Sequence, residues 1–323
     1  MLRKLAPHGH LPQEATEVKL DTARFSGHET FTLRYGWLTK AVHLIRENPQ
    51  GFGDDDAMVK LGVGKNMVRS IKHWAMATRV LEEDSEIKDN RGRFLRVSDF
   101  GEAVFGDSGF DPYLENQSTL WLLHFCLASR LTSPTTWYWA FNVFPRTEFT
   151  ANQLMAELRR ATSESDTVKV AENTIRRDVN CFIRTYASSQ HLRMSAVEDT
   201  LDCPLAELRL IHEIDESGLL AFNRSDHLTL PTWVFAFALA DYWDRFPAEV
   251  ATLGFREIAY EPGSPGRVFK LTESAVSKHL HALEKITNKA WSFDSTAGIS
   301  QVYRHRPVRP MEFLNGKHTL TLG

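Results

Sequence analysis

The fold that we predict for this chain rests on one stretch of its sequence, Leu61-Gly62-Val63-Gly64-Lys65-Asn66-Met67-Val68-Arg69-Ser70. A short helix over about residues 55–60 leads into this stretch, the two glycines break it, and a longer helix begins near Lys65. A helix, a tight turn that contains glycine and a second helix form the helix-turn-helix pattern. In the second helix the apolar residues recur on one face. The opposite face carries three basic residues: Lys65, Arg69 and Lys72.

The residues after this helix predict a small β-hairpin. Asn90-Arg91-Gly92 is a turn signal, and residues 93–97 alternate as a strand does. Ser98 is then placed to cap a short helix that runs through Val104. A two-stranded hairpin directly after a recognition helix is a wing. We therefore predict a winged helix over about residues 25–106, with Arg91 and Arg93 in its wing.

The same glycines bear a superficial likeness to a phosphate-binding loop. Residues 62–66 lack the spacing of that motif and the Ser or Thr after its lysine, and they follow a helix where the motif needs a strand. A turn between two helices explains the glycines better. The sequence predicts neither a nucleotide nor a redox cofactor.

The rest of the chain predicts further helical units. A helix from about Glu172 has apolar residues on one side, and its other side includes Arg176, Arg177 and Arg184. This pattern is again that of a helix-turn-helix, but without an evident wing. The last third opens with a helix over residues 232–244 and ends in a basic tail.

The predicted fold class is mainly α, or α+β with small β wings, and multi-domain, built from winged-helix and helix-turn-helix units. Residues 120–127, which include His124, and the aromatic residues 137–144 are expected in the core. The predicted domains are an N-terminal winged-helix domain over 1–112, a helical middle domain with a helix-turn-helix-like unit over 113–205, and a C-terminal helical domain with a basic tail over 206–323.

Charge is segregated along the chain. The 323 residues carry a formal net charge of −3, and 42% of them are hydrophobic, which excludes a disordered tail protein and a polycation that coats nucleic acid. Residues 57–80 nevertheless hold five basic residues and no acidic one. Such a helix binds phosphate oxygens and fits the major groove of DNA. The alternative is a solvated helix face; the predicted wing favours nucleic acid, although winged helices also bind proteins.

Cysteine usage and hydropathy indicate a cytoplasmic protein. Cys126, Cys181 and Cys203 are dispersed and form no CxxC pair, so no disulfide framework is expected. The first residues contain no apolar stretch of the kind that signal peptides have. No run of about 18 apolar residues exists, so we expect no contact with a membrane.

The densest group of chemically reactive side chains lies in Phe25-Ser26-Gly27-His28-Glu29-Thr30-Phe31, with Arg34 further on. His28 can act as a base or a ligand, Glu29 as a ligand, and Arg34 as a phosphate clamp. The same stretch fits a capping box, with Ser26 as the N-cap and Glu29 at N3 of a helix that begins near His28. The residues alone favour capping. The two interpretations are compatible if His28 and Arg34 face outward.

Four strings of this sequence resemble the SspB family: FSGHETF (25–31), RYGWL (34–38), LGVGKNMVRS (61–70) and DCPLAEL (202–208). Members of that family accompany bacterial systems of single-stranded DNA phosphorothioation, in which sulfur replaces a non-bridging phosphate oxygen. The resemblance spans about residues 25–215. It implies a DNA-nicking endonuclease of anti-phage defence, which acts beside a cysteine desulfurase, an ATP pyrophosphatase-like protein and an ATPase.

The expected activity is therefore nicking of double-stranded DNA. From their chemistry, we place catalysis near three residues: His28, Glu29 and Arg34. Eight basic residues are expected to bind duplex DNA: Lys65, Arg69, Lys72, Arg91, Arg93, Arg176, Arg177 and Arg184. A divalent cation such as Mg²⁺ fits phosphodiester chemistry, but no metal spacing in the sequence assigns its ligands.

Two other functions stay open. A non-catalytic winged-helix adaptor would bind DNA and recruit the sulfur-transfer enzymes, and the lack of a recognisable nuclease motif favours it. A transcriptional regulator would read an operator as a dimer. The sequence also leaves open whether the chain forms a homodimer.

Overall fold

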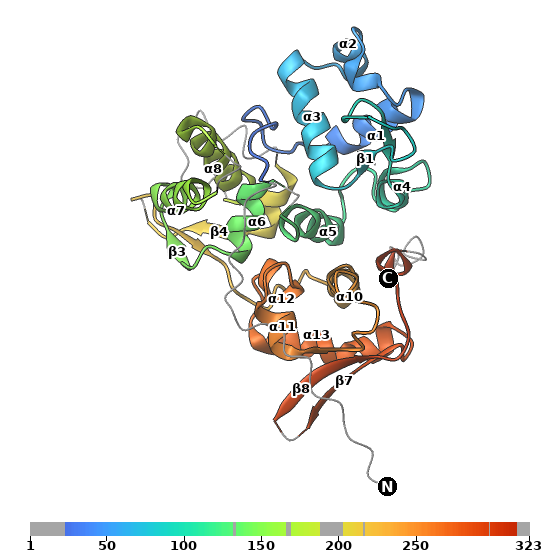
Figure 1. Cartoon of the computed structure of the whole chain (residues 1–323), viewed down its shortest axis with the longest axis vertical. Helices are drawn as coiled ribbons and strands as arrows, with labels where there is room; N and C mark the ends of the chain where they lie inside the picture. The colour runs from blue at the N-terminus through green and yellow to red at the C-terminus, as the bar shows by residue number, and fades with distance from the viewer. Residues whose placement is uncertain are drawn as a thin grey trace.

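The computed structural model describes residues 23–131, 134–165, 169–187, 203–215, 217–296 and 298–314 (Figure 1). These residues form an α+β structure, in which helices are combined with small antiparallel sheets. Figure 1 shows the elements in three groups that follow one another along the chain, from blue through green to red. The end of the expected basic tail lies outside the described residues.

The first group contains the predicted helix, turn, helix and hairpin. Its elements are α1 (Trp37–Glu47), η1 (Gly51–Gly53), α2 (Ala57–Leu61), α3 (Lys65–Ala77), β1 (Leu81–Glu83), β2 (Leu95–Val97) and α4 (Asp99–Phe105). Gly62 ends α2 with a φ of 66°, a left-handed value that glycine adopts without strain. β1 and β2 pair antiparallel. The Ser98 hydroxyl accepts a hydrogen bond from Gly101 N at 2.9 Å, which confirms the predicted cap.

The first helix does not begin near His28, as the sequence had suggested. Ser26, Glu29 and Thr30 have φ values of 63°, 48° and 68°, which are left-handed and incompatible with a right-handed helix. α1 begins only at Trp37. The expected capping box is therefore wrong: Ser26 N bonds to Asp178 and the His28 carbonyl accepts from Ser70, both far away in the sequence.

The second group contains a three-stranded sheet that the sequence did not predict. Its elements are α5 (Gln117–Ala128), α6 (Thr135–Asn142), β3 (Glu148–Phe149), α7 (Ala151–Ser163), α8 (Glu172–Tyr186), η2 (Pro204–Leu208), β4 (Ile211–Glu213) and β5 (Leu220–Phe222). β5 lies between β3 and β4 and is antiparallel to both. The chain thus forms a hairpin after α8, where we had expected none.

The third group repeats the strand order of the second. Its elements are α10 (Thr232–Trp243), β6 (Thr252–Gly254), α11 (Phe255–Tyr260), α12 (Pro265–Val268), α13 (Glu273–Ile286), β7 (Trp291–Thr296), β8 (Ile299–Arg304) and η3 (Pro310–Phe313). β8 lies between β6 and β7, as β5 lies between β3 and β4. Part of the expected basic tail is thus a strand. Its Arg304 packs over Trp243 and donates to the Val250 carbonyl at 2.9 Å.

The core contains the two apolar stretches that we expected there. All of α6 is buried, and α5 is buried on every side from Thr119 to Ala128. The ring nitrogens of His124 lie 2.9 Å from the Tyr186 hydroxyl and 3.0 Å from the Val268 carbonyl. Burial lowers the pKa of His124 to about 3, so the ring is a neutral part of the core. Among the described residues, no helix has the length and apolarity needed to cross a membrane.

A buried carboxylate joins the first group to the third. Asp241 of α10 lies 2.9 Å from Arg79, 2.6 Å from Arg130 and 2.7 Å from Arg245. Burial raises the pKa of Asp241, but the three guanidinium groups lower it by more, so that the carboxyl has a pKa below its ordinary value. The ionised Asp241 therefore fixes the end of α3 against α10.

Candidate nucleic-acid interface

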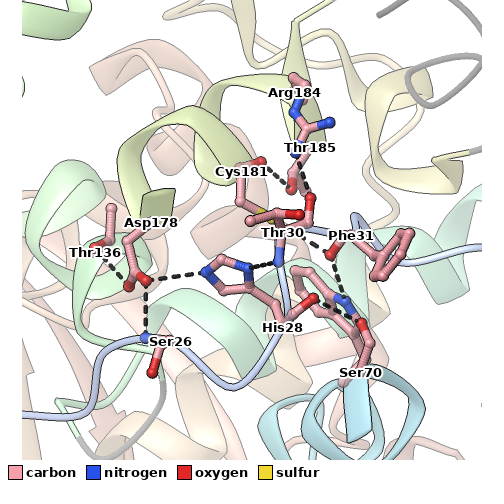
Figure 2. Close-up of polar contacts among 11 residues, drawn as sticks. Ser26, His28, Thr30, Phe31, Ser70, Thr136, Asp178, Cys181, Arg184 and Thr185 are labelled. Carbon is pink, nitrogen blue, oxygen red and sulfur yellow. Dashed lines mark hydrogen bonds and ion pairs between the residues drawn. The ribbon is translucent and has the colours of Figure 1, made fainter. Parts of the chain in front are cut away.

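Residues 25–31, here called the strap, lie between α3 and α8 (Figure 2). Two side chains of α3 hold the strap by its main-chain oxygens. The Ser70 hydroxyl donates to the His28 carbonyl at 2.9 Å, and the Trp74 indole N–H donates to the Phe31 carbonyl at 3.1 Å. One edge of the strap is thereby fixed to the helix that carries the predicted DNA contacts.

α8 holds the same strap from the other side. The Cys181 thiol donates to the Phe31 carbonyl at 3.4 Å, and the Arg184 guanidinium donates to the Thr30 carbonyl. Arg184, whose contact with DNA stays a prediction, is partly exposed and bonds to the strap. The strap thus links α3 and α8, which lie far apart in the sequence.

Asp178 of α8 is the strongest anchor of the strap. Its carboxylate accepts hydrogen bonds from Ser26 N at 2.8 Å and from the Thr136 hydroxyl at 3.2 Å, and it lies 3.0 Å from His28 Nε2. Asp178 is 1% exposed. A buried carboxylate is stable only where such partners replace water.

His28 does not face outward. Its side chain is buried, Nε2 faces Asp178, and Nδ1 accepts a hydrogen bond from Thr30 N at 3.0 Å. This arrangement places the ring proton on Nε2. Both nitrogens are therefore occupied within the protein, and the expected outward orientation is wrong. The catalytic role that we predicted for His28 stays a prediction, but the geometry supports a role in holding the strap.

Gly27 is the position where the strap approaches α3 most closely. A Cβ atom at this position would lie 2.6 Å from Nδ1 of His73, and the φ of Gly27 is +94°. Burial and the neighbouring His28 lower the pKa of His73 to about 3, so this ring is neutral. Only glycine fits between the strap and α3 here.

Glu29 and Arg34 are less enclosed than His28. The Glu29 side chain is 34% exposed, and its carboxylate lies 3.7 Å from the Arg69 guanidinium of α3. Arg34 is partly exposed and packs over the rings of Phe31 and Trp37, each 5.7 Å away. The structure thus brings Glu29, at the middle of the strap, to one of the predicted DNA contacts.

The three basic residues of α3 that we predicted to contact DNA differ in how accessible they are to a ligand. Lys65 and Arg69 are exposed. Lys72 is partly buried, and its ammonium donates to the Gly92 carbonyl in the hairpin at 2.7 Å. Desolvation lowers the pKa of Lys72, while Glu83 opposes this effect. Lys72 therefore fastens the hairpin to α3, whereas Lys65 and Arg69 are the exposed cations of this helix, and Arg69 faces Glu29.

The remaining predicted contacts are exposed. Arg91 and Arg93 lie in the loop between β1 and β2, where Arg93 Nε donates to the Asn90 carbonyl at 3.3 Å. Arg176 and Arg177 lie on the outer face of α8, and Arg176 is 3.6 Å from Glu172. Exposed cations thus occur on both helices that hold the strap.

Asp178 was not among the predicted site residues, although the sequence carries a signal for it. Asp178 lies between Ile175, Val179 and Phe182, on the face of α8 that the apolar spacing predicts to be buried. A carboxylate at a core position requires a buried partner. Which partner it binds could not be predicted, because Ser26 and His28 are some 150 residues away.

No protein-only metal site is evident in this region. Over the described ranges, there is no group of three or more His, Cys, Asp or Glu residues that could hold a metal ion. Two carboxylates lie among the exposed cations: Glu29 beside Arg69 and Glu172 beside Arg176. The donor set of the described residues therefore does not fit a closed metal centre.

The chain belongs to a family whose model is described as "Protein of unknown function (DUF4007)" and matches residues 25–317. Among solved structures, it is similar to "Magnesium ion-bound SspB crystal structure", with a TM-score of 0.83 and 30% sequence identity over 91% of this chain and 87% of that chain. "SspB crystal structure" matches with a TM-score of 0.82 at the same identity and coverage. No curated protein matches significantly.

These likenesses identify the chain as a member of the SspB family, which confirms the resemblance seen in its motifs. They cover 91% of this chain. Membership of this family supports involvement in the Ssp system.

Proposed function

We propose that this protein binds duplex DNA and nicks it as a component of DNA phosphorothioation by the Ssp system. One observation carries the proposal: the strap ties together two helices with exposed cations and places Glu29 beside one of them. Lys65 and Arg69 of α3 and Arg176 and Arg177 of α8 would bind phosphates on either side.

We also propose that each of the three groups is a winged-helix unit and a separate domain. In the second group β3 precedes α7 and α8 and pairs with β5, the second strand of the hairpin. In the third group β6 precedes α11 and pairs with β8 in the same way. α3, α8 and α13 then occupy the position of the recognition helix. The hairpins β1–β2, β4–β5 and β7–β8 would be the wings.

Charge distinguishes the third unit from the first. The exposed face of α13 carries Lys278 and Lys285, but also Glu273 and Glu284, so its charges balance. α3 carries no acidic residue at all. Since phosphate binding needs an excess of cations over carboxylates, α3 fits DNA better than α13 does.

Glu29 is the residue that fits the chemistry of nicking best. Its partly exposed carboxylate can accept the proton of a water molecule that attacks phosphorus. The P–O bond to the leaving oxygen then breaks, and that oxygen takes a proton from solvent. Arg69 and Arg34 would stabilise the charge that develops on the phosphate. His28 would position the strap and not touch DNA.

Magnesium is bound in one of the similar solved structures. The described residues of this chain assemble no site of three ligands, so the proposed steps use only its own side chains. A nicking assay in Mg²⁺ and in excess EDTA measures whether the ion is needed.

The test of the proposed function is conversion of supercoiled plasmid into open circles. We expect purified protein to produce open circles, and linear DNA to appear only later. A protein that binds the plasmid but leaves it supercoiled, with and without Mg²⁺, would contradict nicking and support the adaptor. One tight operator without nicking would support the regulator.

The proposed DNA contact predicts a specific salt dependence. Each lost phosphate contact reduces the slope of log K against log salt concentration by about 0.9, so replacing both Lys65 and Arg69 with alanine should reduce it by about 2. Lys278→Ala with Lys285→Ala on α13 removes the same charge and should leave the slope unchanged. Duplex binding measured by fluorescence anisotropy between low and high salt checks this. Equal slopes for both double variants would show that α3 does not contact DNA.

A further inference from the structure

A groove between α7 and α8 lies beside the site described so far and shares Arg176 with it. It encloses about 460 Å³, and none of its lining residues belongs to the strap. Such a volume falls in the range of small-ligand sites, roughly 300–1,000 Å³. Its lining includes three residues of α7 and three of α8: Asn152, Met155, Arg159, Ile175, Arg176 and Asn180.

The groove has an apolar floor. Ile175 is 2% exposed, and Met155 is partly buried against the core. A flat apolar ring can lie on such side chains, and the thioether of methionine adapts its shape to aromatic faces. The floor therefore suits the face of a nucleobase.

The rim of the groove carries polar groups of two kinds. Asn152 and Asn180 are exposed, and their amides offer both donors and acceptors, which match the edges of bases. Arg159 and Arg176 lie 3.7 Å and 3.6 Å from Glu172, which holds both guanidinium groups at the groove. Guanidinium groups bind phosphate in the same manner as carboxylate.

We propose that this groove binds one unpaired nucleotide of a DNA strand. The base would lie on Met155, next to the nearly buried Ile175, and the phosphate would exchange with Glu172 as the partner of Arg159 and Arg176. A base within a duplex has both faces covered by its neighbours, so only an unstacked base can reach this floor. The proposal rests on the proposed function, because it concerns the DNA that the same chain would bind and nick.

Neighbouring arginines on α7 provide a matched test. Arg159 lines the groove, whereas Arg160 is not among its lining residues and pairs with Glu157 at 3.1 Å. Arg159→Ala and Arg160→Ala remove the same charge from adjacent positions. We expect Arg159→Ala to weaken binding of a 12-nucleotide single strand several-fold more than Arg160→Ala does. Equal losses of affinity for the two variants would show that the effect comes from general electrostatics, and would overturn the proposal.

The floor and rim are tested by a second variant. Met155→Ala with Asn180→Ala removes the contact with the base face and a hydrogen-bonding amide, so it should weaken single-strand binding by about tenfold or more. A 2-aminopurine in the strand should change its emission on binding to the wild type, and not to this variant. Thermal melting verifies that the variants fold. Unchanged affinity and emission in the folded variant would overturn the proposal.

Two arms separate this proposal from its alternatives. If a free deoxynucleoside monophosphate bound as tightly as the oligonucleotide, the proposal that the ligand is a nucleotide within a DNA strand would be overturned. Plasmid nicking is measured in parallel. A wild type that does not nick, but loses single-strand affinity on these substitutions, refutes the nicking function and upholds the groove. If the wild type nicks plasmid but the groove variants bind the single strand as tightly as it does, the proposed groove is refuted and the nicking function stands.

Discussion

Plasmid should stay supercoiled when Glu29 is replaced by glutamine. Glutamine keeps the size of the side chain but cannot accept a proton from water, so nicking should fall by about 100-fold or more. Loss of one negative charge beside Arg69 should leave duplex affinity equal or slightly higher. The measurement is the rate of open-circle formation at saturating protein, together with anisotropy for binding.

Glu82→Gln is the control for this substitution. Glu82 is also exposed and paired with an arginine, since its carboxylate lies 2.5 Å from Arg96. It belongs to β1, away from the strap, so its loss should leave the nicking rate unchanged. If Glu29→Gln nicks at the wild-type rate, Glu29 is not the base. If both variants lose activity together, the loss follows from charge and not from position.

The largest effect on stability is expected from Asp178→Ala. This substitution removes the acceptor of Ser26 N, of the Thr136 hydroxyl and of the His28 ring, and leaves the last two donors buried. Each unsatisfied buried group costs about 1–3 kcal/mol, so the free energy of unfolding should fall by about 3–5 kcal/mol. Urea unfolding at neutral pH provides the measurement.

Asp107→Ala is the matched control for Asp178. Asp107 also pairs with a basic side chain, Arg46 at 2.6 Å, but its side chain is 82% exposed. Its loss should lower the free energy of unfolding by less than about 1 kcal/mol. Asp178→Asn should fall between the two, because the amide oxygen still accepts a hydrogen bond. A loss below 1 kcal/mol for Asp178→Ala would show that the strap is anchored elsewhere.

Local signals in the sequence predicted the local structure correctly. Glycine at position 62 ends α2, and the cap at Ser98 begins α4, since both depend on neighbours within a few residues. The apolar spacing also gave the buried face of α3 and the place of His124 in the core. Together with the family motifs, these signals were sufficient to predict the α+β fold class and the SspB family.

Long-range pairing explains what the sequence did not show. The strand β3 has two residues, and its pairing of Glu148 with Ala221 joins segments with no common pattern. The strap was misread for the same reason. Ser26 and Glu29 have the spacing of a capping box. Their actual partners are Asp178 and Arg69, and a local sequence pattern cannot predict contacts with residues so far away in the sequence.

The mode of attachment of the strap bears on how readily this protein could be re-engineered. α3 and Arg184 hold it by the carbonyl oxygens of His28, Thr30 and Phe31, and these atoms are present whatever side chain a residue carries. Position 29 can therefore serve as an exchangeable position on a rigid scaffold. Its φ of 48° favours Asn, Asp and Gly as replacements and disfavours β-branched residues. New reactive groups could thus be installed there without rebuilding the surrounding architecture.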